Sequence, residues 1–334
     1  MQPWESDPAY QTVARAFLDG DPLDQVGGPL DVRAVVAGIR PEAKERCLVE
    51  EVPWDRFPEG AKVGRIMERM RSGSLADVRG ALDTLDGLCA NDMRAVVAPA
   101  VPLLVRIGAD PDSGLRTRAL GVTAAAARVG YLGVCTRTAM LRYRGADDWL
   151  YEPTGYLANW STQAARDAIA ADTEHLLPLI DDLSPAVRIA AVYVLAAAAD
   201  RAQEIRNAFR TRLLTERIPA VRSSLVLAMA ELTRAHPNAE TVAWFRDNWS
   251  SPKGLPEVRV SAALGWMCLS DLPVPDPLRA MVDDLATEGM ARMMAPLPWM
   301  RAAEHIAGDG LPRCLRAMLH PDAPETTHAC DPWS

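Results

Sequence analysis

One short segment, residues 145–160, gathers the side chains of this sequence best suited to binding or to proton-transfer chemistry. It reads GADDWLYEPTGYLANW, in a chain whose aromatic content is only 6%. Its candidate site residues are Asp147, Asp148, Trp149, Tyr151, Glu152, Tyr156 and Trp160. Trp and Tyr dominate the hot spots of protein interfaces, and carboxylates beside them attract cationic groups. We therefore expect the segment to anchor a partner protein that has a basic surface.

The same residues allow two other interpretations. Trp and Tyr rings can seal an irregular part of a fold by packing over its ends, which would make the segment a structural plug. Alternatively, Asp147, Asp148 and Glu152 could act as general acid or base in a small-molecule pocket closed by the segment, which would make the protein an enzyme. Pro153 and Gly155 disfavour a helix, so the segment is expected to form a loop.

Two Glu–His dipeptides, Glu174–His175 and Glu304–His305, are the other candidates for chemistry. A catalytic metal needs more than two converging ligands, and adjacent helical residues point about 100° apart. We therefore expect no metal and no cofactor. The sequence also lacks a phosphate-binding loop, a dinucleotide-binding glycine pattern and a Gly-x-Ser-x-Gly nucleophile motif.

Composition and charge limit the kinds of partner and the cellular compartment that we expect for this protein. The 334-residue chain has a formal net charge of -8, and nucleic-acid binding needs clustered Lys and Arg, so we expect no nucleic-acid partner. No apolar run reaches the roughly 18 residues that a membrane span needs. The six cysteines show no Cys-x-x-Cys spacing, and the N-terminal residues lack the apolar core of a secretory signal. We predict a cytoplasmic protein whose reduced thiols act as small apolar side chains.

A repeated motif predicts the architecture. The segments SPAVRIAAVYVLAAA, IPAVRSSLVLAMAEL and LPEVRVSAALGWMCL share Pro-x-Val-Arg followed by small and apolar residues. Their arginines are Arg188, Arg222 and Arg259, and weaker copies lie at Arg33, Arg79, Arg116 and Arg301. A period near forty residues is typical of helical solenoids.

The residue types within each copy predict a helix pair. Proline lacks an N–H and fits the first turn of a helix, so each Pro is expected to begin one. Small residues after each Arg would let a neighbouring inner helix approach closely. They are Ala190, Ala191, Ser224, Ser261 and Ala262. The apolar runs upstream, such as EHLLPLID and TVAWFRDNW, are predicted to form the outer helices.

These motifs resemble HEAT-repeat proteins over roughly residues 60–310, and the segments near Arg116 and Arg188 look similar to actinobacterial HEAT-repeat proteins of uncertain function. The resemblance implies an all-α, right-handed α-solenoid of about eight helix pairs. It also implies that the motif arginines pair with acidic residues at neighbouring turns. The candidates are Asp110, Asp181, Asp182 and Glu216. We predict an N-terminal cap at 1–60, a solenoid at 61–310 and a C-terminal helix and flexible tail at 311–334.

The repeat is interrupted between Arg116 and Arg188, a gap of about two periods. A copy is expected near residue 152, and the 145–160 segment stands in its place. Insertions in solenoids often project on the binding face. We therefore favour non-catalytic binding of another protein, as a scaffold or immunity-type module, through the concave face and this loop. Catalysis in a pocket between the loop and the inner helices is the alternative.

Overall fold

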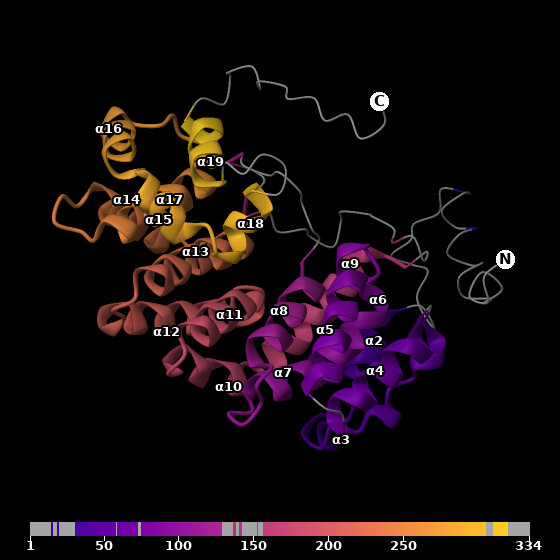
Figure 1. Ribbon diagram of the computed structural model, residues 1–334. Coiled ribbons are helices and arrows are strands. Elements are labelled where there is room, and N and C mark those ends of the chain that lie inside the picture. The colour runs from indigo at the N-terminus through magenta and orange to yellow at the C-terminus, as the bar shows by residue number, and fades with distance from the viewer. Residues whose placement is uncertain are drawn as a thin grey trace, which may run out of the picture. The chain divides into compact units, whose positions relative to one another are not determined.

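The structure is a computed structural model that describes residues 31–57, 59–72, 75–128, 156–304 and 310–319. It also describes Arg15, Asp19, Glu152 and residues 136–137 and 140–141. The elements within these ranges are helices, and no strand lies among them (Figure 1). The predicted all-α class is therefore confirmed.

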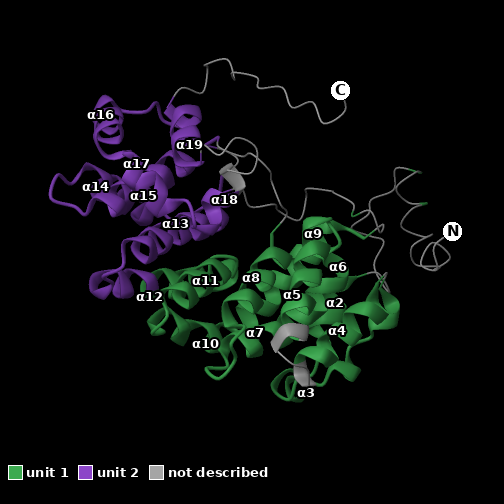
Figure 2. Ribbon diagram, viewed as in Figure 1, with its two compact units in different colours: residues 1–130, 144–208 green, residues 131–143, 209–334 purple. Residues whose placement is uncertain are grey.

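The chain divides into two compact units (Figure 2). Unit 1 comprises residues 1–130 and 144–208, and unit 2 comprises residues 131–143 and 209–334. The division falls inside helix α12 (Ala202–Thr215). The boundaries that we predicted for the repeat region, after residues 60 and 310, do not coincide with the division between the two units. They stay predictions of where the repeats begin and end.

Unit 1 is built from short helices, several of which pack in pairs. Its described elements are α2 (Val32–Ala37), α3 (Pro41–Glu45), η3 (Val49–Glu51), η4 (Trp54–Arg56), α4 (Gly60–Ser72), α5 (Leu75–Ala90), α6 (Arg94–Val97), η5 (Ala98–Ala100), α7 (Val101–Ala109), α8 (Arg116–Ala126), α9 (Ala158–Ala171), α10 (Thr173–Leu176), η6 (Leu177–Asp181), α11 (Pro185–Leu195) and η7 (Ala199–Arg201). Helix α4 packs on α5, α7 on α8, and α10 with η6 on α11. Among the second members of these pairs, α5 contacts α8 and α8 contacts α11.

The direct contact between α8 and α11 explains the interrupted repeat. Although these helices carry motif arginines about two periods apart, they are neighbours in space. Between them the structure describes α10 and η6, which pack on α11, and helix α9, which begins at Ala158 and packs against α2, α6, η5 and α7. The last three residues of the 145–160 segment are thus helical, whereas the sequence predicted a loop throughout. An insertion at residues 145–160 stays a prediction.

Unit 2 continues the pattern of neighbouring helices. Its described elements are α13 (Pro219–Ala235), α14 (Ala239–Ser250), α15 (Pro256–Leu269), α16 (Asp276–Leu285), α17 (Glu288–Met294), α18 (Pro298–Glu304) and α19 (Gly310–Leu319), together with the last part of α12. Helix α15 packs between α13 and α14, and α16 contacts both α14 and α15. Helix α19 packs on α17 and α18.

The helix starts and the small interior residues follow the predicted chemistry. Pro185, Pro219 and Pro256 each occupy the first turn of their helices, and Pro298 begins α18. Of the small residues, Ala191, Ser224, Ser261 and Ala262 are buried and Ala190 is half-buried. At Gly265 a Cβ atom would lie 2.9 Å from the Ala230 Cβ, so α13 and α15 approach closely there. The predictions of proline starts and close inner packing are confirmed.

The thiols act as expected where the structure describes them. Cys89, Cys268 and Cys314 are buried, Cys47 is half-buried, and none of the four forms a disulfide. Burial raises the pKa of Cys89 and of Cys268 to about 12. Cys135 and Cys330 lie outside the described residues. Among the helices that the structure describes, none has the length and apolar character that crossing a bilayer requires.

Candidate functional site

The structure places three of the seven predicted site residues, and all three are buried. The exposed fractions are 3% for Glu152, 4% for Tyr156 and 4% for Trp160. Asp147, Asp148, Trp149 and Tyr151 lie outside the described residues. A partner can reach little of a side chain this deeply buried.

Glu152 is bound at the start of helix α6. Both of its carboxylate oxygens accept from the Ala95 backbone N–H, at 3.0 and 3.1 Å, near the start of that helix. Its own N–H donates to the Tyr156 carbonyl oxygen at 2.8 Å. An N–H in the first turn of a helix has no intrahelical acceptor, so a buried carboxylate is a fitting cap. This contact accounts for Glu152 without a role in acid–base catalysis.

Tyr156 and Trp160 also form contacts within unit 1. The Tyr156 hydroxyl donates to the Arg56 carbonyl oxygen at 2.6 Å, and its ring lies 5.7 Å from that of Phe57. The Arg33 guanidinium lies over the Trp160 ring, 4.2 Å from its centroid. The Glu152 carboxylate and the Tyr156 and Trp160 rings are therefore buried in contacts within unit 1, which favours the plug interpretation for these three residues. Whether they also contact a partner stays a prediction. A binding role for Asp147, Asp148, Trp149 and Tyr151 stays a prediction.

Two of the motif arginines, Arg116 and Arg222, pair across neighbouring helix starts. Arg116 on α8 binds Asp182, in the turn before α11, at 2.7 Å and also donates to the Gly108 carbonyl. In unit 2, Arg222 Nε on α13 donates to the Glu257 carboxylate on α15 at 2.6 Å. The structural role implied for Asp182 is thereby confirmed. Although partial burial opposes it, hydrogen bonds from Ser184 N–H and Arg116 lower the pKa of the Asp182 carboxyl.

Glu216 contacts the motif arginine Arg222 through its backbone carbonyl, whereas the resemblance implied pairing through its carboxylate. Its carboxylate, 5% exposed as a residue, accepts from the backbone N–H groups of Arg217 and Ile218 and from the Arg212 guanidinium. Its backbone carbonyl, not its carboxylate, accepts from Arg222 at 2.9 Å. Glu216 therefore shapes the turn before α13. Asp110 also has a local role, since its Oδ1 accepts from the Asp112 N–H at 3.0 Å.

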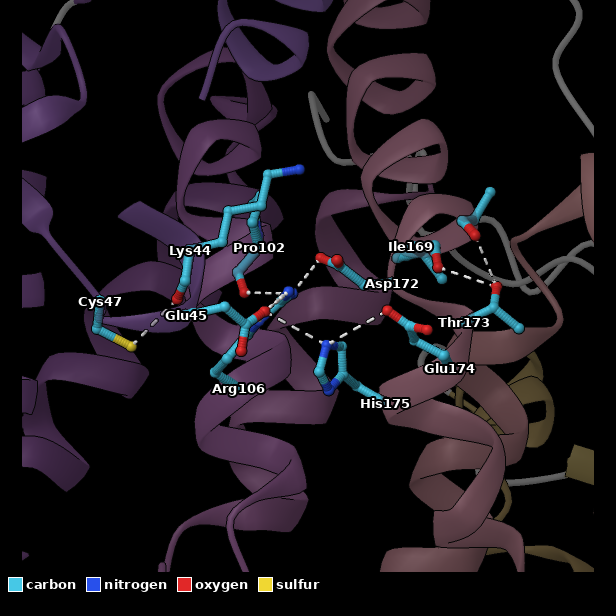
Figure 3. A network of polar contacts seen from close by, with 11 residues as sticks. Lys44, Glu45, Cys47, Pro102, Arg106, Ile169, Asp172, Thr173, Glu174 and His175 are labelled. Atoms are coloured by element: carbon cyan, nitrogen blue, oxygen red, sulfur yellow. Dashed lines mark hydrogen bonds and ion pairs between the residues drawn. The ribbon is translucent and has the colours of Figure 1, made fainter. Parts of the chain in front are cut away.

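A second polar cluster joins helices of unit 1 around Arg106 (Figure 3). This guanidinium, on α7, binds the Asp172 carboxylate at 2.5 Å and the Glu45 carboxylate of α3 at 3.1 Å. The His175 imidazole of α10 lies 3.4 Å from Glu45 and 3.9 Å from Glu174 (Figure 3). The Arg106 side chain is 13% exposed and that of Asp172 is 6% exposed.

The Arg106 cluster has the chemistry of a structural ion-pair network that joins neighbouring helices. Hydrogen bonding to Arg106, with a smaller contribution from His175, lowers the pKa of the Glu45 carboxyl, which weakens it as an acid or a base at neutral pH. The central guanidinium also disfavours a metal cation. Among the described residues, no group of three or more His, Cys, Asp and Glu side chains is arranged to hold a metal ion. Glu174–His175 thus gathers no further ligands there, and His305 is outside the described part of the chain.

The sequence analysis missed a set of exposed apolar side chains. Five large apolar residues stand out on the described surface: Leu183 (98% exposed), Leu214 (86%), Ile218 (39%), Leu255 (49%) and Leu272 (64%). Leu183, Ile218 and Leu255 each lie one or two positions before the proline of a repeat copy. In sequence, the available signal is an apolar residue directly before the motif proline in two copies and one position earlier in the third.

Comparison of the chain with models of protein families, with curated proteins and with solved structures found no match.

Proposed function

We propose that the protein is a non-catalytic, HEAT-like repeat scaffold that binds another protein. The observation that carries the proposal is the recurrence of a large exposed apolar residue before the helix start of three copies. Leu183, Ile218 and Leu255 occupy this place, with exposed fractions of 98, 39 and 49%. Single exposed apolar residues are common, but Ile218 and Leu255 both directly precede the motif proline, and Leu183 lies one position earlier in its copy. In the weaker copy at Arg301 the equivalent Leu297 is buried, so the exposed apolar residues belong to the three strong copies.

The repeat framework does not need these side chains. Residues just before a helix are usually Ser, Thr, Asp or Asn, which cap its first N–H groups. Here the motif proline begins the helix and the motif arginine links its start to the next one, through Arg116–Asp182 in unit 1 and Arg222–Glu257 in unit 2. The exposed apolar residues are therefore available for intermolecular contact. Large apolar anchors are what protein interfaces bury at their centres.

A right-handed α-solenoid of about eight helix pairs is part of the proposal. It is supported by the paired helices within each unit and by the arginine links between successive helix starts. We further propose that the concave face of such a solenoid contributes to binding. Asp147, Asp148, Trp149 and Tyr151 would add contacts to a basic part of the partner. A cytoplasmic location belongs to the same proposal and is supported by the unbridged thiols.

Co-purification from the cells that make the protein tests the proposal. The full chain would be compared with a triple variant, Leu183→Ser, Ile218→Ser and Leu255→Ser, and with Leu272→Ser as a matched exposed control. We expect a stoichiometric protein with the wild type and the control and at least a tenfold loss with the triple variant. Circular dichroism should show that all three fold alike, since the replaced side chains are exposed.

Two outcomes would count against the proposal. A protein retained equally by all three samples would show that the helix-start residues are not the binding surface. A bound metabolite without any protein would instead favour the enzyme alternative.

A further inference from the structure

We infer that the helix-start turns of unit 2 dock a polypeptide segment in which apolar side chains are flanked by carboxylates. These turns, residues 214–218 and 251–255, are called the unit 2 turn surface below. The inference rests on the proposed protein-binding function and assigns it a place and a partner chemistry. It differs from the basic partner expected of the 145–160 loop.

The two turns lie side by side. Helices α13 and α15 pack against each other, and α13 begins at Pro219 while α15 begins at Pro256. Arg222, in the first turns of α13, donates to Glu257, the second residue of α15. Because this contact joins the two helix starts, Ile218 and Leu255, which immediately precede them, occupy adjacent places. Leu214 precedes Ile218 by one helical turn at the end of α12.

Hydrogen bonds within the turn before α13 bury the Glu216 carboxylate, while the apolar side chains of the unit 2 turn surface stay exposed to solvent. Glu216 is buried, and its carboxylate accepts from the N–H groups of Arg217 and Ile218, each at 2.8 Å. The turn is thus organised around an inward carboxylate. Leu214 and Ile218 remain 86 and 39% exposed, and Leu255 remains 49% exposed in the next turn. The surface therefore offers three exposed apolar side chains, two from the turn at 214–218 and one from the turn at 251–255.

The charges around these apolar residues are positive. Arg217 and Lys253 are exposed, and neither forms an ion pair within the described residues. The nearby carboxylates of Glu216 and Glu257 are buried and already accept hydrogen bonds from arginines. At the end of α14, Arg246 and Asp247 lie 3.8 Å apart and offset each other. The two turns thus present cations without exposed carboxylates, although the whole chain is acidic.

The corresponding turns of unit 1 have the opposite charge. Asp110 and Asp112 are exposed in the turn before α8, and Asp181 is exposed two residues before Leu183, which is 98% exposed. A basic segment would be attracted to unit 1 and repelled by Arg217 and Lys253. Complementary potential selects partners and orients their approach. The occupant of the unit 2 turn surface is therefore an acidic segment with apolar anchors.

Peptide selection on the full-length protein tests the inference. A displayed library of random 16-residue peptides would be panned on the wild type, and enriched peptides would be measured by fluorescence anisotropy. We expect Asp or Glu beside Leu, Ile, Phe or Trp. Ile218→Ser combined with Leu255→Ser should weaken binding by about tenfold or more. Arg217→Glu with Lys253→Glu should weaken it by a similar factor and reduce its salt dependence. Leu272→Ser, three residues beyond the far end of α15, should leave the affinity unchanged.

The outcomes separate this inference from the proposed function. Enriched basic peptides, or acidic peptides insensitive to Ile218→Ser and Leu255→Ser, would overturn the inference while leaving protein binding elsewhere intact. Failure to enrich any peptide would overturn the inference too. In that case, the partner that co-purifies with the Leu183→Ser variant would be compared with the partner that co-purifies with the wild type. Loss of the partner from the variant would show that protein binding takes place through unit 1. Binding to the chain's own acidic N-terminal peptide, residues 1–30, in preference to all library peptides would contradict an external partner.

Discussion

Glu152 is a buried carboxylate whose partner is a backbone N–H. Both oxygens accept from Ala95, so Glu152→Gln replaces one acceptor by a donor beside that N–H. Leaving a buried polar group poorly paired costs about 1–3 kcal/mol. We expect urea unfolding of unit 1 to show a loss of that size. Glu174→Gln is the matched control, because the Glu174 side chain is 83% exposed and its replacement should change stability by less than about 0.5 kcal/mol. Equal stability of both variants would show that the contact contributes nothing.

The buried thiols predict a ranking of reactivity. Burial raises the pKa of Cys89 and Cys268 to about 12, so little thiolate forms at pH 8, and the two residues are only 1 and 2% exposed. Cys47 is half-buried. With iodoacetamide at pH 8, peptide mass spectrometry should find Cys47 modified at least tenfold faster than Cys89 or Cys268. Comparable rates in the native protein would mean that the helices around the two buried thiols open readily.

At the scale of helices, two glycines should respond oppositely to alanine. A Cβ at Gly265 would lie 2.9 Å from Ala230 and 3.0 Å from the Phe245 ring, whereas Gly121 in the middle of α8 has open space. Gly265→Ala should destabilise unit 2 by about 1–3 kcal/mol through overpacking. Gly121→Ala should stabilise unit 1 by about 0.5–1 kcal/mol through helix propensity. Thermal unfolding of both variants checks the signs, and a stabilising Gly265→Ala would contradict the close packing of α13 and α15.

The link between α13 and α15 can be measured in the same way. Arg222 and Glu257 are both largely buried, so removing one partner leaves the other charge unpaired. Arg222→Met should therefore cost about 3–5 kcal/mol, and the double variant with Glu257→Gln should cost less than the sum of the two single changes. Additive losses in urea unfolding would show that the two side chains do not interact.

The helices were more predictable from the sequence than the candidate site was. Proline starts and helical periodicity are local properties, so α11, α13 and α15 could be anticipated from Pro185, Pro219 and Pro256. Whether a Trp or a Glu is buried depends on residues distant in the sequence. Glu152 binds Ala95, and Tyr156 binds Arg56, which no local pattern reveals. The exposure of Ile218 likewise depends on the buried Glu216 carboxylate, which accepts a hydrogen bond from the Ile218 N–H.

At the scale of the whole molecule, acid should weaken unit 1. Although burial opposes it, the pKa of Asp31, Glu45 and Asp182 is lowered in the folded chain by hydrogen bonds, from Arg33 to Asp31, from Arg106 to Glu45, and from the Ser184 N–H and Arg116 to Asp182. A carboxyl with a lowered folded pKa adds stability above its unfolded pKa, about 4, and loses it as pH falls through the folded value.

Asp167 opposes this trend, because burial raises its pKa and acid relieves the cost of its charge. Since three carboxyls are lowered and one is raised, the unfolding temperature of unit 1 should fall between pH 5 and pH 3. Differential scanning calorimetry at low salt would measure it. Stability that stays constant or rises over this range would contradict the arginine contacts.

Site-specific photo-crosslinking in the native cells tests protein docking at the helix starts most directly. A benzophenone amino acid would replace Ile218 in one strain and Leu272 in another, since both are exposed residues of unit 2. We predict one dominant crosslinked protein at position 218, joined through a segment rich in Asp or Glu and apolar residues, and little or none at position 272. Absence of a crosslink at 218, or the same diffuse products at both positions, would contradict the proposed function.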